Sequence, residues 1–519
     1  MRMGLAAGMG EGGWGTRAAI LGARPILGGC HVARLKYAMN AFRVAGRFPA
    51  LVLVLALRGP LLAADPSATD VPTTSDRGAE AVTRGRELLL TRPYLPPDFD
   101  QEVFDQLWTT WEEPLRSRAE EAPVAERRRL AFERYGLLPH PDDPTRSLQY
   151  VTDANGSWTM SCLACHQGQV GGRMVPGLPN SNYALETLTE EVRLVKVRQR
   201  KPFGHMDMGS LLLPLGTTNG TTNAVIFGVA LMRHRDAALN IVHRPPRFDL
   251  VHHDMDAPAW WHYRRRKSLY ADGFAAKGHR VLMQFLLVKE NGPEKFAAWE
   301  DDFRAIESWI LSLAPPKWPH AIDTALADRG RAVFAAHCGT CHGSYGAEGS
   351  YPDRVVPIEE VGTDRVRLDS LTAKERGDLN ASWFGHFGDD GRGLEDRATA
   401  TGYVAPPLDG IWATAPYLHN GSVPTLWHLL HPAERPVVWR RSPAGYDTSR
   451  VGLEVEELTA MPEGKILPSV RRGYFDTRRP GKTAAGHDFP DALTEDEKAM
   501  LAKSAASVQG IVDVVNKSA

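Results

Sequence analysis

The chain contains one five-residue pattern twice: two cysteines separated by two residues, followed at once by a histidine. The copies are formed by Cys162, Cys165 and His166, and by Cys338, Cys341 and His342. Two thiols at this spacing reach the two vinyl groups of one porphyrin, and the histidine beside them becomes the proximal ligand of the iron. Each copy is a complete attachment unit, so the sequence predicts two covalently bound haem c groups with His166 and His342 as iron ligands.

Two other uses of paired cysteines fit this pattern less well. The cysteine pairs of a zinc ribbon lie roughly 15–20 residues apart, whereas most of a domain separates Cys165 from Cys338. A thioredoxin-like redox pair needs a strand-to-helix context and does not explain why a histidine follows the second cysteine in both copies. Haem attachment is therefore favoured over both.

Length and charge narrow the function classes. The 519 residues suffice for two or three domains, and the formal net charge is −1,. This balance gives no argument for nucleic-acid binding. The basic clusters at 127–129 and 264–267 are expected to be solvated helix faces. For the second cluster the alternative is contact with haem propionates, because a carboxylate near a buried iron needs a cationic partner.

The N-terminal region has the order of a secretory signal. Basic residues precede an apolar run over 48–57, and small residues follow it,. A bilayer span takes about 20 apolar residues, so the run is too short, with an uncleaved anchor as the alternative. Residues 1–64 are expected to be a signal peptide and N-terminal extension, with Met39 as an alternative start. The mature protein is then bacterial, periplasmic or secreted, without a transmembrane span, and lacks Cys30.

The sequence predicts a mainly α fold with extensive loops and two cytochrome c-like haem domains. Residues 65–318 form the N-terminal haem domain, which starts with a helical segment over 79–135, and residues 319–519 form the C-terminal one. Residues 149–158 indicate a short strand and turn, and 168–179 a loop rich in glycine and proline. The first domain therefore carries atypical insertions.

Helix signals are strongest on either side of the predicted linker. Apolar residues recur at three- and four-residue steps over 295–313, and prolines at 315 and 316 stop that helix,. A short helix then leads into Cys338, as in a cytochrome c module. Beyond it the chain is expected to be rich in loops until Thr494 and Glu497, which form a capping box that begins a last helix.

The sixth iron ligand decides whether a haem stores electrons or reacts with a small molecule. For the second haem two residues are candidates. Met461, before a proline, resembles the methionine loop of small cytochromes, and His487 lies just before the last helix. Methionine would raise the potential of the haem and histidine would lower it.

The run APYLHNGSVPTL over residues 415–426 resembles the motif of the di-haem cytochrome c peroxidase superfamily. The segment 473–489, with the helix that carries Lys498, is most similar to the rubber-oxygenase-type branch of that superfamily. The resemblance spans about residues 145–510. In that branch a histidine in a Gly-His-acidic-aromatic setting is the distal ligand of the C-terminal haem, which implies His487 rather than Met461. It also implies that the iron of the first haem is left open or weakly capped.

Several further residues are candidates around the two haems. His419 is expected to lie in a tight turn near the second haem, with ligation as the alternative. Trp261, Phe274 and Phe285 are expected to line the distal pocket of the first haem or to relay electrons, with core packing as the alternative. Alternative sixth ligands for the first haem are His205, His234, His252, His253 and His279.

These expectations combine into one function. We expect an oxidoreductase in which the open N-terminal haem reacts with peroxide or dioxygen and the six-coordinate C-terminal haem relays electrons, with a periplasmic electron-transfer protein as a partner. The alternatives are a pure electron-transfer di-haem cytochrome without a substrate site, and a haem module that docks to another periplasmic complex.

Overall fold

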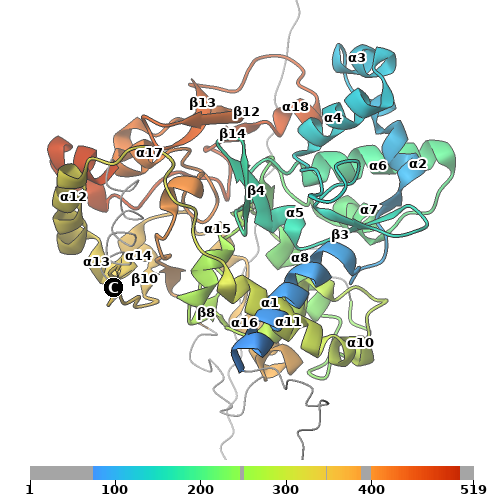
Figure 1. The fold of residues 1–519 in the computed structure, drawn as a ribbon, viewed down its shortest axis with the longest axis horizontal. Coiled ribbons are helices and arrows are strands. Elements are labelled where there is room, and N and C mark those ends of the chain that lie inside the picture. Colours follow the sequence, from blue (N-terminus) through green and yellow to red (C-terminus); the bar gives the residue numbers. More distant parts are fainter. Residues whose placement is uncertain (1–73, 246–249, 347, 387–398, 503–519) are drawn as a thin grey trace, which may run out of the picture. The chain divides into compact units, whose positions relative to one another are not determined.

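Helices dominate the regular structure, as predicted (Figure 1). The computed structural model describes residues 74–245, 250–346, 348–386 and 399–502. The predicted signal peptide, Met39 and Cys30 lie outside these ranges. No helix within them is both long and apolar enough to cross a membrane.

The first half of the described chain holds eleven α-helices. They are α1 (Thr74–Thr91), α2 (Gln101–Gln106), α3 (Leu115–Glu121), α4 (Val124–Tyr135), α5 (Leu163–His166), α6 (Leu185–Gln199), α7 (His205–Leu212), α8 (Ala224–Met232), α9 (His279–Leu282), α10 (Pro293–Ala298) and α11 (Glu300–Ser312). The described helices that follow the linker are α12 (Thr324–His337), α13 (Gly339–His342), α14 (Ile358–Val361), α15 (Val366–Asp369), α16 (Ala373–Ala381), α17 (Leu426–Leu430) and α18 (Pro468–Arg471). The 3-10 helices used below are η2 (Trp260–Arg264) and η3 (Met283–Leu286).

The described strands are short and form small antiparallel sheets. They are β1 (Phe99–Asp100), β2 (Tyr150–Thr152), β3 (Ser157–Met160), β4 (Gln167–Val170), β5 (Arg173–Pro176), β6 (Thr221–Thr222), β7 (Met255–Asp256), β8 (Ser268–Leu269), β9 (Ala275–Ala276), β10 (Val355–Pro357), β11 (Gly402–Val404), β12 (Val438–Asp447), β13 (Gly452–Leu458) and β14 (Tyr474–Asp476).

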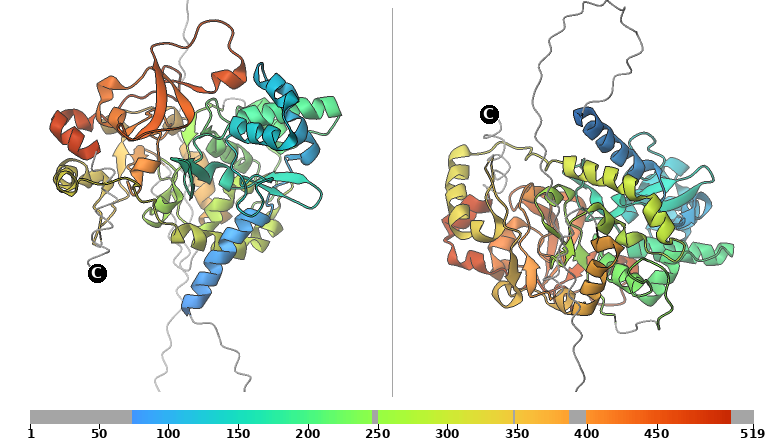
Figure 2. Two further views of the ribbon diagram at one scale, coloured as in Figure 1. Left: turned by 45° about the horizontal axis from the view of Figure 1, so that its top comes forward. Right: turned by 90° about the horizontal axis from the view of Figure 1, so that it is seen from below.

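The helix expected over 295–313 is divided in two at Trp299, which ends α10 and precedes α11. Three acidic residues form the first turn of α11, where their negative charges interact favourably with the positive end of the helix dipole,. Its apolar face is buried, and α1 lies along it (Figure 2). Asp302 of α11 accepts a hydrogen bond from Arg84 of α1 at 2.9 Å, which joins the two helices.

The segments that flank the first cysteine pair are β-hairpins. The strand and turn expected over 149–158 are confirmed as β2 and β3, with Tyr150 opposite Met160. The loop expected over 168–179 is wrong in part, because β4 and β5 pair there. Gly171 and Gly172 both have positive φ, which a two-residue hairpin turn requires,. The first haem unit is thus held between two hairpins.

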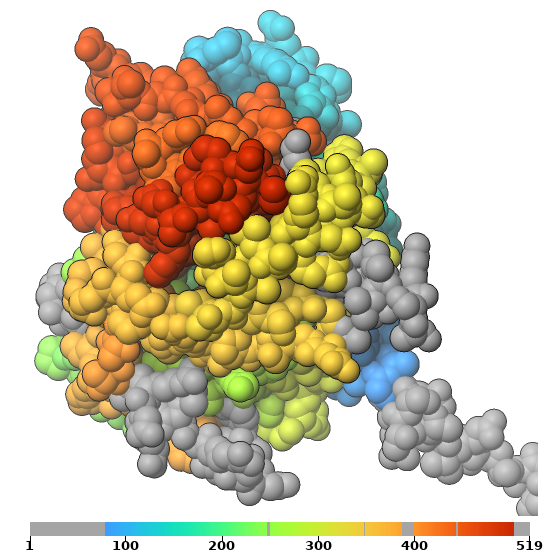
Figure 3. Space-filling model, turned by 90° about the vertical axis from the view of Figure 1, so that its left-hand side faces the viewer, coloured from blue at the N-terminus to red at the C-terminus, as the bar shows by residue number. Residues whose placement is uncertain are grey.

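The second unit begins as expected. Asp323 caps α12, which runs directly into Cys338 and α13. The expectation that the C-terminal region is rich in loops up to Thr494 is wrong in part, because β12 pairs with β13 and β14 in a three-stranded sheet. The capping box of Thr494 and Glu497 is confirmed by reciprocal hydrogen bonds. The last helix lies against the segment with α12 in the space-filling view (Figure 3).

Residues from Val71 onward form one compact unit. Its largest apolar core contains Trp260 and Trp261 from before residue 319 together with Trp412 and Trp439 from after it. The two predicted haem domains therefore share a core, and their division at residue 319 stays a prediction.

Candidate haem sites

The imidazole of His166 is oriented by two contacts. Its Nδ1 donates to the carbonyl oxygen of Pro258 at 3.2 Å, and its ring stacks on Trp260, with 4.5 Å between ring centroids. Donation through Nδ1 leaves Nε2 as the free nitrogen, which is the tautomer that a metal needs. Burial lowers the pKa of His166 to about 4, so the ring is neutral near pH 7.

His342 is held in the same way. Its Nδ1 donates to the carbonyl oxygen of Pro406 at 2.8 Å, and burial lowers its pKa. The two histidines thus present Nε2 through the same device, a proline carbonyl from a distant part of the chain. Each follows its second cysteine on a single helical turn, α5 or α13.

The four motif cysteines form no disulfide. Burial raises the pKa of Cys162 to about 11, of Cys165 to about 12 and of Cys338 to about 11. A thioredoxin-like pair works through a thiol whose pKa is lowered toward neutrality. These protonated thiols therefore disfavour the redox-pair alternative. Among the residues described, no group of three or more His, Cys, Asp or Glu side chains is arranged to hold a bare metal ion.

His487 faces His342. Their ring centroids are 6.2 Å apart and the ring planes are inclined at 62°. Two metal–nitrogen bonds of about 2 Å, plus roughly 1.1 Å from each nitrogen to its ring centre, separate trans imidazoles by about 6.2 Å. Nδ1 of His487 is buried without a hydrogen-bond partner, so this ring lacks the carbonyl contact that fixes the tautomer of His342. The pair therefore fits a six-coordinate haem iron.

The loop that carries His487 is fixed by its backbone. Gly486 has φ +79°, and a Cβ there would lie 2.3 Å from the backbone carbon of Gly362. The amide of His487 donates to Val361 at 2.6 Å. Arg435 donates to the carbonyl oxygens of Ala484 and Gly486, both at 2.6 Å. Only glycine at position 486 permits this close approach to Gly362. The position of the His487 imidazole is therefore set by Gly486 and by the hydrogen bonds of the surrounding backbone.

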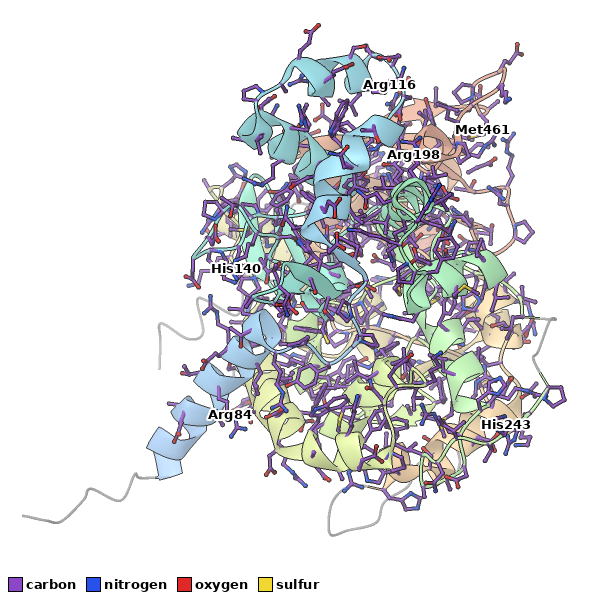
Figure 4. The ribbon with its side chains drawn as sticks, turned by 90° about the vertical axis from the view of Figure 1, so that its right-hand side faces the viewer. Arg84, Arg116, His140, Arg198, His243 and Met461 are labelled. Carbon is purple, nitrogen blue, oxygen red and sulfur yellow. The ribbon has the colours of Figure 1, made fainter. Side chains whose placement is uncertain are left out.

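The motif over 415–426 supports the same loop. Asn420 is fully buried, and its amide donates to the carbonyl oxygens of Gly481 and Thr483 at 3.3 and 3.0 Å. His419 stacks on Tyr403, with centroids 4.2 Å apart. The expected turn is present, because the amide of Gly421 donates to the carbonyl oxygen of Leu418 at 3.1 Å. Ligation by His419 stays the alternative. Met461 lies in the loop between β13 and α18 (Figure 4).

Segment η2 connects the two haem units. Trp260 stacks on His166, and the next residue, Trp261, donates from Nε1 to the carbonyl oxygen of Asp409 at 2.7 Å. Asp409 lies three residues after Pro406, the acceptor for His342. A short path of bonds and stacked rings therefore joins one proximal histidine to the other.

Arg265 makes a second connection between the units. It pairs with Asp409 at 2.8 Å and lies over the ring of Tyr345, whose hydroxyl donates to the carbonyl oxygen of His342 at 3.0 Å. Its neighbours also have protein partners: Arg264 donates to Leu313 and Arg266 pairs with Asp353. The expectation of a solvated face at 264–267 is therefore wrong, because three arginines of this cluster bind other parts of the protein.

The three proposed pocket residues are in different surroundings. Trp261 and Phe274 are buried, and Phe274 stacks on Tyr270 at 4.7 Å. Phe285 of η3 is 41% exposed, so it is the least enclosed of the three.

Ligation of the first haem by one of the alternative histidines stays a prediction, since ring nitrogens without a hydrogen-bond partner are present on His205 and His253. His252 bonds Asn223 and Asp254, His279 bonds Glu300, His253 bonds Val251, His205 lies 3.6 Å from Asp98, and His234 follows α8. Among the described residues, the ring that stacks on His166 is that of Trp260.

Comparison with known proteins finds a family match in the C-terminal part of the chain. Residues 402–440 match the model of the RoxA-like, cytochrome c-like family. This stretch contains Pro406, the motif with His419 and Asn420, and Arg435, so it supports a haem c cofactor. The match contains neither cysteine pair and does not reach His487.

Two relatives come from Sinorhizobium fredii. The uncharacterized protein y4iM is 29% identical over 256 residues, which cover 45% of this chain and 56% of the relative. The uncharacterized protein y4iJ is 32% identical over 258 residues, covering 38% and 41%. The matched part thus spans about half the length of these relatives.

Proposed function

We propose that the protein is a periplasmic di-haem c-type cytochrome that acts as an oxidoreductase. The haem attached at Cys162 and Cys165 is open and reacts with peroxide or dioxygen. The haem attached at Cys338 and Cys341 is six-coordinate, with His342 and His487 as ligands, and relays electrons. The observation that carries the proposal lies at the second site, where the imidazole of His487 faces His342 with 6.2 Å between ring centroids. The open position at the first site is what the resemblance to the di-haem peroxidase superfamily implies.

A haem supplies one-electron transfer, and an iron with a vacant position also binds peroxide or dioxygen. The protein's own residues do the rest. The carbonyl oxygen of Pro258 accepts a hydrogen bond from Nδ1 of His166 and fixes the tautomer. Stacking on Trp260 fixes the ring's rotation. On the second haem, Arg435 and Gly486 hold His487 in place, so this site favours electron storage over binding of a substrate.

Electrons pass between the haems through η2 in this proposal. The path runs from the ring of Trp260 to Trp261, across the 2.7 Å hydrogen bond to Asp409 and along the backbone to Pro406, which contacts His342. Trp261 is buried and its ring is held by that bond, which suits a fixed relay. A periplasmic electron-transfer protein would supply electrons from outside.

Haem counting combined with peroxide titration tests the proposal. The exported wild-type protein should contain two haems per chain, and the double variants C162A/C165A and C338A/C341A should contain one each. Peroxide should alter the absorption spectrum of the wild type and of C338A/C341A, but not that of C162A/C165A. A spectrum that peroxide leaves unchanged in all three would contradict the enzyme and favour a pure electron carrier.

A further inference from the structure

Three buried polar atoms without partners lie next to the loop that carries His487. They are Nε of Arg367, Nε2 of His253 and Oγ1 of Thr363. Arg367 and His253 are each 1% exposed, and Thr363 is 6% exposed. A buried donor or acceptor left unpaired costs about 1–3 kcal/mol. Nε of Arg367 and Oγ1 of Thr363 can both donate to an acceptor, whereas Nε2 of His253 cannot, because the proton of that ring is on Nδ1, which donates to the carbonyl oxygen of Val251,.

Contacts around Gly481 and Gly486 bring these residues to the haem side of the fold. A Cβ on Gly481 would lie 3.2 Å from Cβ of His253 and 3.8 Å from Val366, the neighbour of Arg367. A Cβ on Gly486 would lie 2.4 Å from the amide nitrogen of Thr363. His253, Val366 and the backbone of Thr363 therefore lie against the two ends of the segment that leads into His487.

Tyr403 and His419 close the same region. The Tyr403 hydroxyl receives the amide of Leu368, next to Arg367, and its ring stacks on His419. Burial and the positive charge of Arg367 together lower the pKa of His419 to about 3. His419 is therefore a neutral neighbour that does not compensate the guanidinium.

The positive charges of the buried arginines in this cluster also favour binding of an anion. Arg367 and Arg376 are both buried and share one carboxylate, Asp272, at 3.1–3.3 Å. The other nearby carboxylate, Asp364, accepts the backbone amides of Val366 and Thr483. A buried cation needs an opposite charge and hydrogen bonds to offset its lost hydration. One carboxylate for two guanidinium groups leaves Arg367 with binding capacity.

We propose that Arg367, with Thr363, binds a propionate of the haem held by His342 and His487. The inference rests on the proposed function, since it requires a haem at the second site. A carboxylate accepts charge-assisted hydrogen bonds from a guanidinium and a hydroxyl, and these are stronger than bonds between neutral groups. The cation beside this propionate then stabilises the reduced haem relative to the oxidised one.

Resonance Raman spectroscopy and redox titration of the full-length holoprotein test this inference. Arg367→Gln should shift the propionate-bending band of the low-spin haem and lower the equilibrium constant for its reduction about tenfold, the size expected for one charge in a protein interior. Thr363→Val removes one hydroxyl at nearly constant shape and should shift the same band, which keeps the test open if Arg367→Gln does not fold. Arg235→Gln is the control, because that buried arginine donates to backbone carbonyls.

Each outcome decides a separate claim. If Arg367→Gln and Thr363→Val retain the low-spin haem with unchanged band and unchanged potential, the cluster binds water and the inference is wrong. A free anion from solution is the other source of the same chemistry, and it would make the wild-type potential depend on acetate concentration, which also overturns the inference. If the wild type itself lacks a low-spin haem, the proposed function fails instead.

Discussion

Arg435 should determine whether His487 stays on the second haem. Its side chain is 5% exposed, and Nη1 donates to the carbonyl oxygens of Ala484 and Gly486 at 2.6 Å. Hydrogen bonds to a charged group contribute about 1.5–3 kcal/mol each. Arg435→Met keeps the length of the side chain and removes these two short bonds, together with longer ones to the carbonyl oxygens of His428, Leu429 and His487. The two short bonds alone give a loss of about 3–6 kcal/mol of anchoring for the loop.

That loss has two measurable results. It shifts the balance between bound and released His487 by about 100- to 10,000-fold, so the low-spin signal of the second haem should decrease or disappear in electron paramagnetic resonance. Unfolding entropy of about 2.1 cal/mol/K per residue gives roughly 1 kcal/mol per degree for this chain, so Tm should fall by about 3–6 °C.

Arg450→Met is the matched control. Arg450 pairs with Glu457 on the surface and is 42% exposed, and such pairs contribute about 0–1 kcal/mol. Its spectrum should equal that of the wild type. An Arg435→Met protein with the full wild-type low-spin signal would refute the reasoning that this arginine holds the ligand loop.

Three further predictions concern the loop glycine, the tryptophan between the two sites and a buried aspartate. Gly486→Ala places a Cβ 2.3 Å from Gly362, so the low-spin signal should be lost; its persistence would mean that the loop tolerates the methyl group. Trp261→Phe removes the donor to Asp409 and should cost about 1 kcal/mol while slowing electron exchange between the haems in pulse radiolysis, with both spectra unchanged; an unchanged rate would exclude this relay. Burial alone would raise the pKa of Asp254, but its buried partner Lys482 and its neighbour His252 lower that pKa below the usual range. Its ionised form therefore contributes stability above about pH 4 that is lost as pH falls through the lowered pKa, and Asp254→Asn should lower Tm at pH 7 and flatten the acid dependence of Tm measured by circular dichroism.

The sequence allowed the attachment units to be predicted because their chemistry depends on residues adjacent in the chain. Cys162, Cys165 and His166 need one helical turn, and spacing alone reveals it. The acceptors Pro258 and Pro406 were not predictable, since they lie 92 and 64 residues from the histidines that they orient. Proline carbonyls carry no local signal of that role.

Other parts of the site depend on tertiary packing in the same way. Arg435 has no distinguishing neighbours in the sequence, and its role appears only when the loop with His487 lies against it. The C-terminal sheet was missed because β12 contains several polar residues and is stabilised by pairing with β13 and β14. The helix break at Trp299 has the same origin, since apolar periodicity continues through it.

Electron paramagnetic resonance of the oxidised, full-length protein tests the central claim most directly. The account predicts one high-spin and one low-spin haem per chain, with the high-spin signal from the haem on His166 and the low-spin signal removed by His487→Ala. Two low-spin haems in equal amounts, with the second unaffected by His487→Ala, would contradict both the vacancy at the first iron and the ligand assigned to the second.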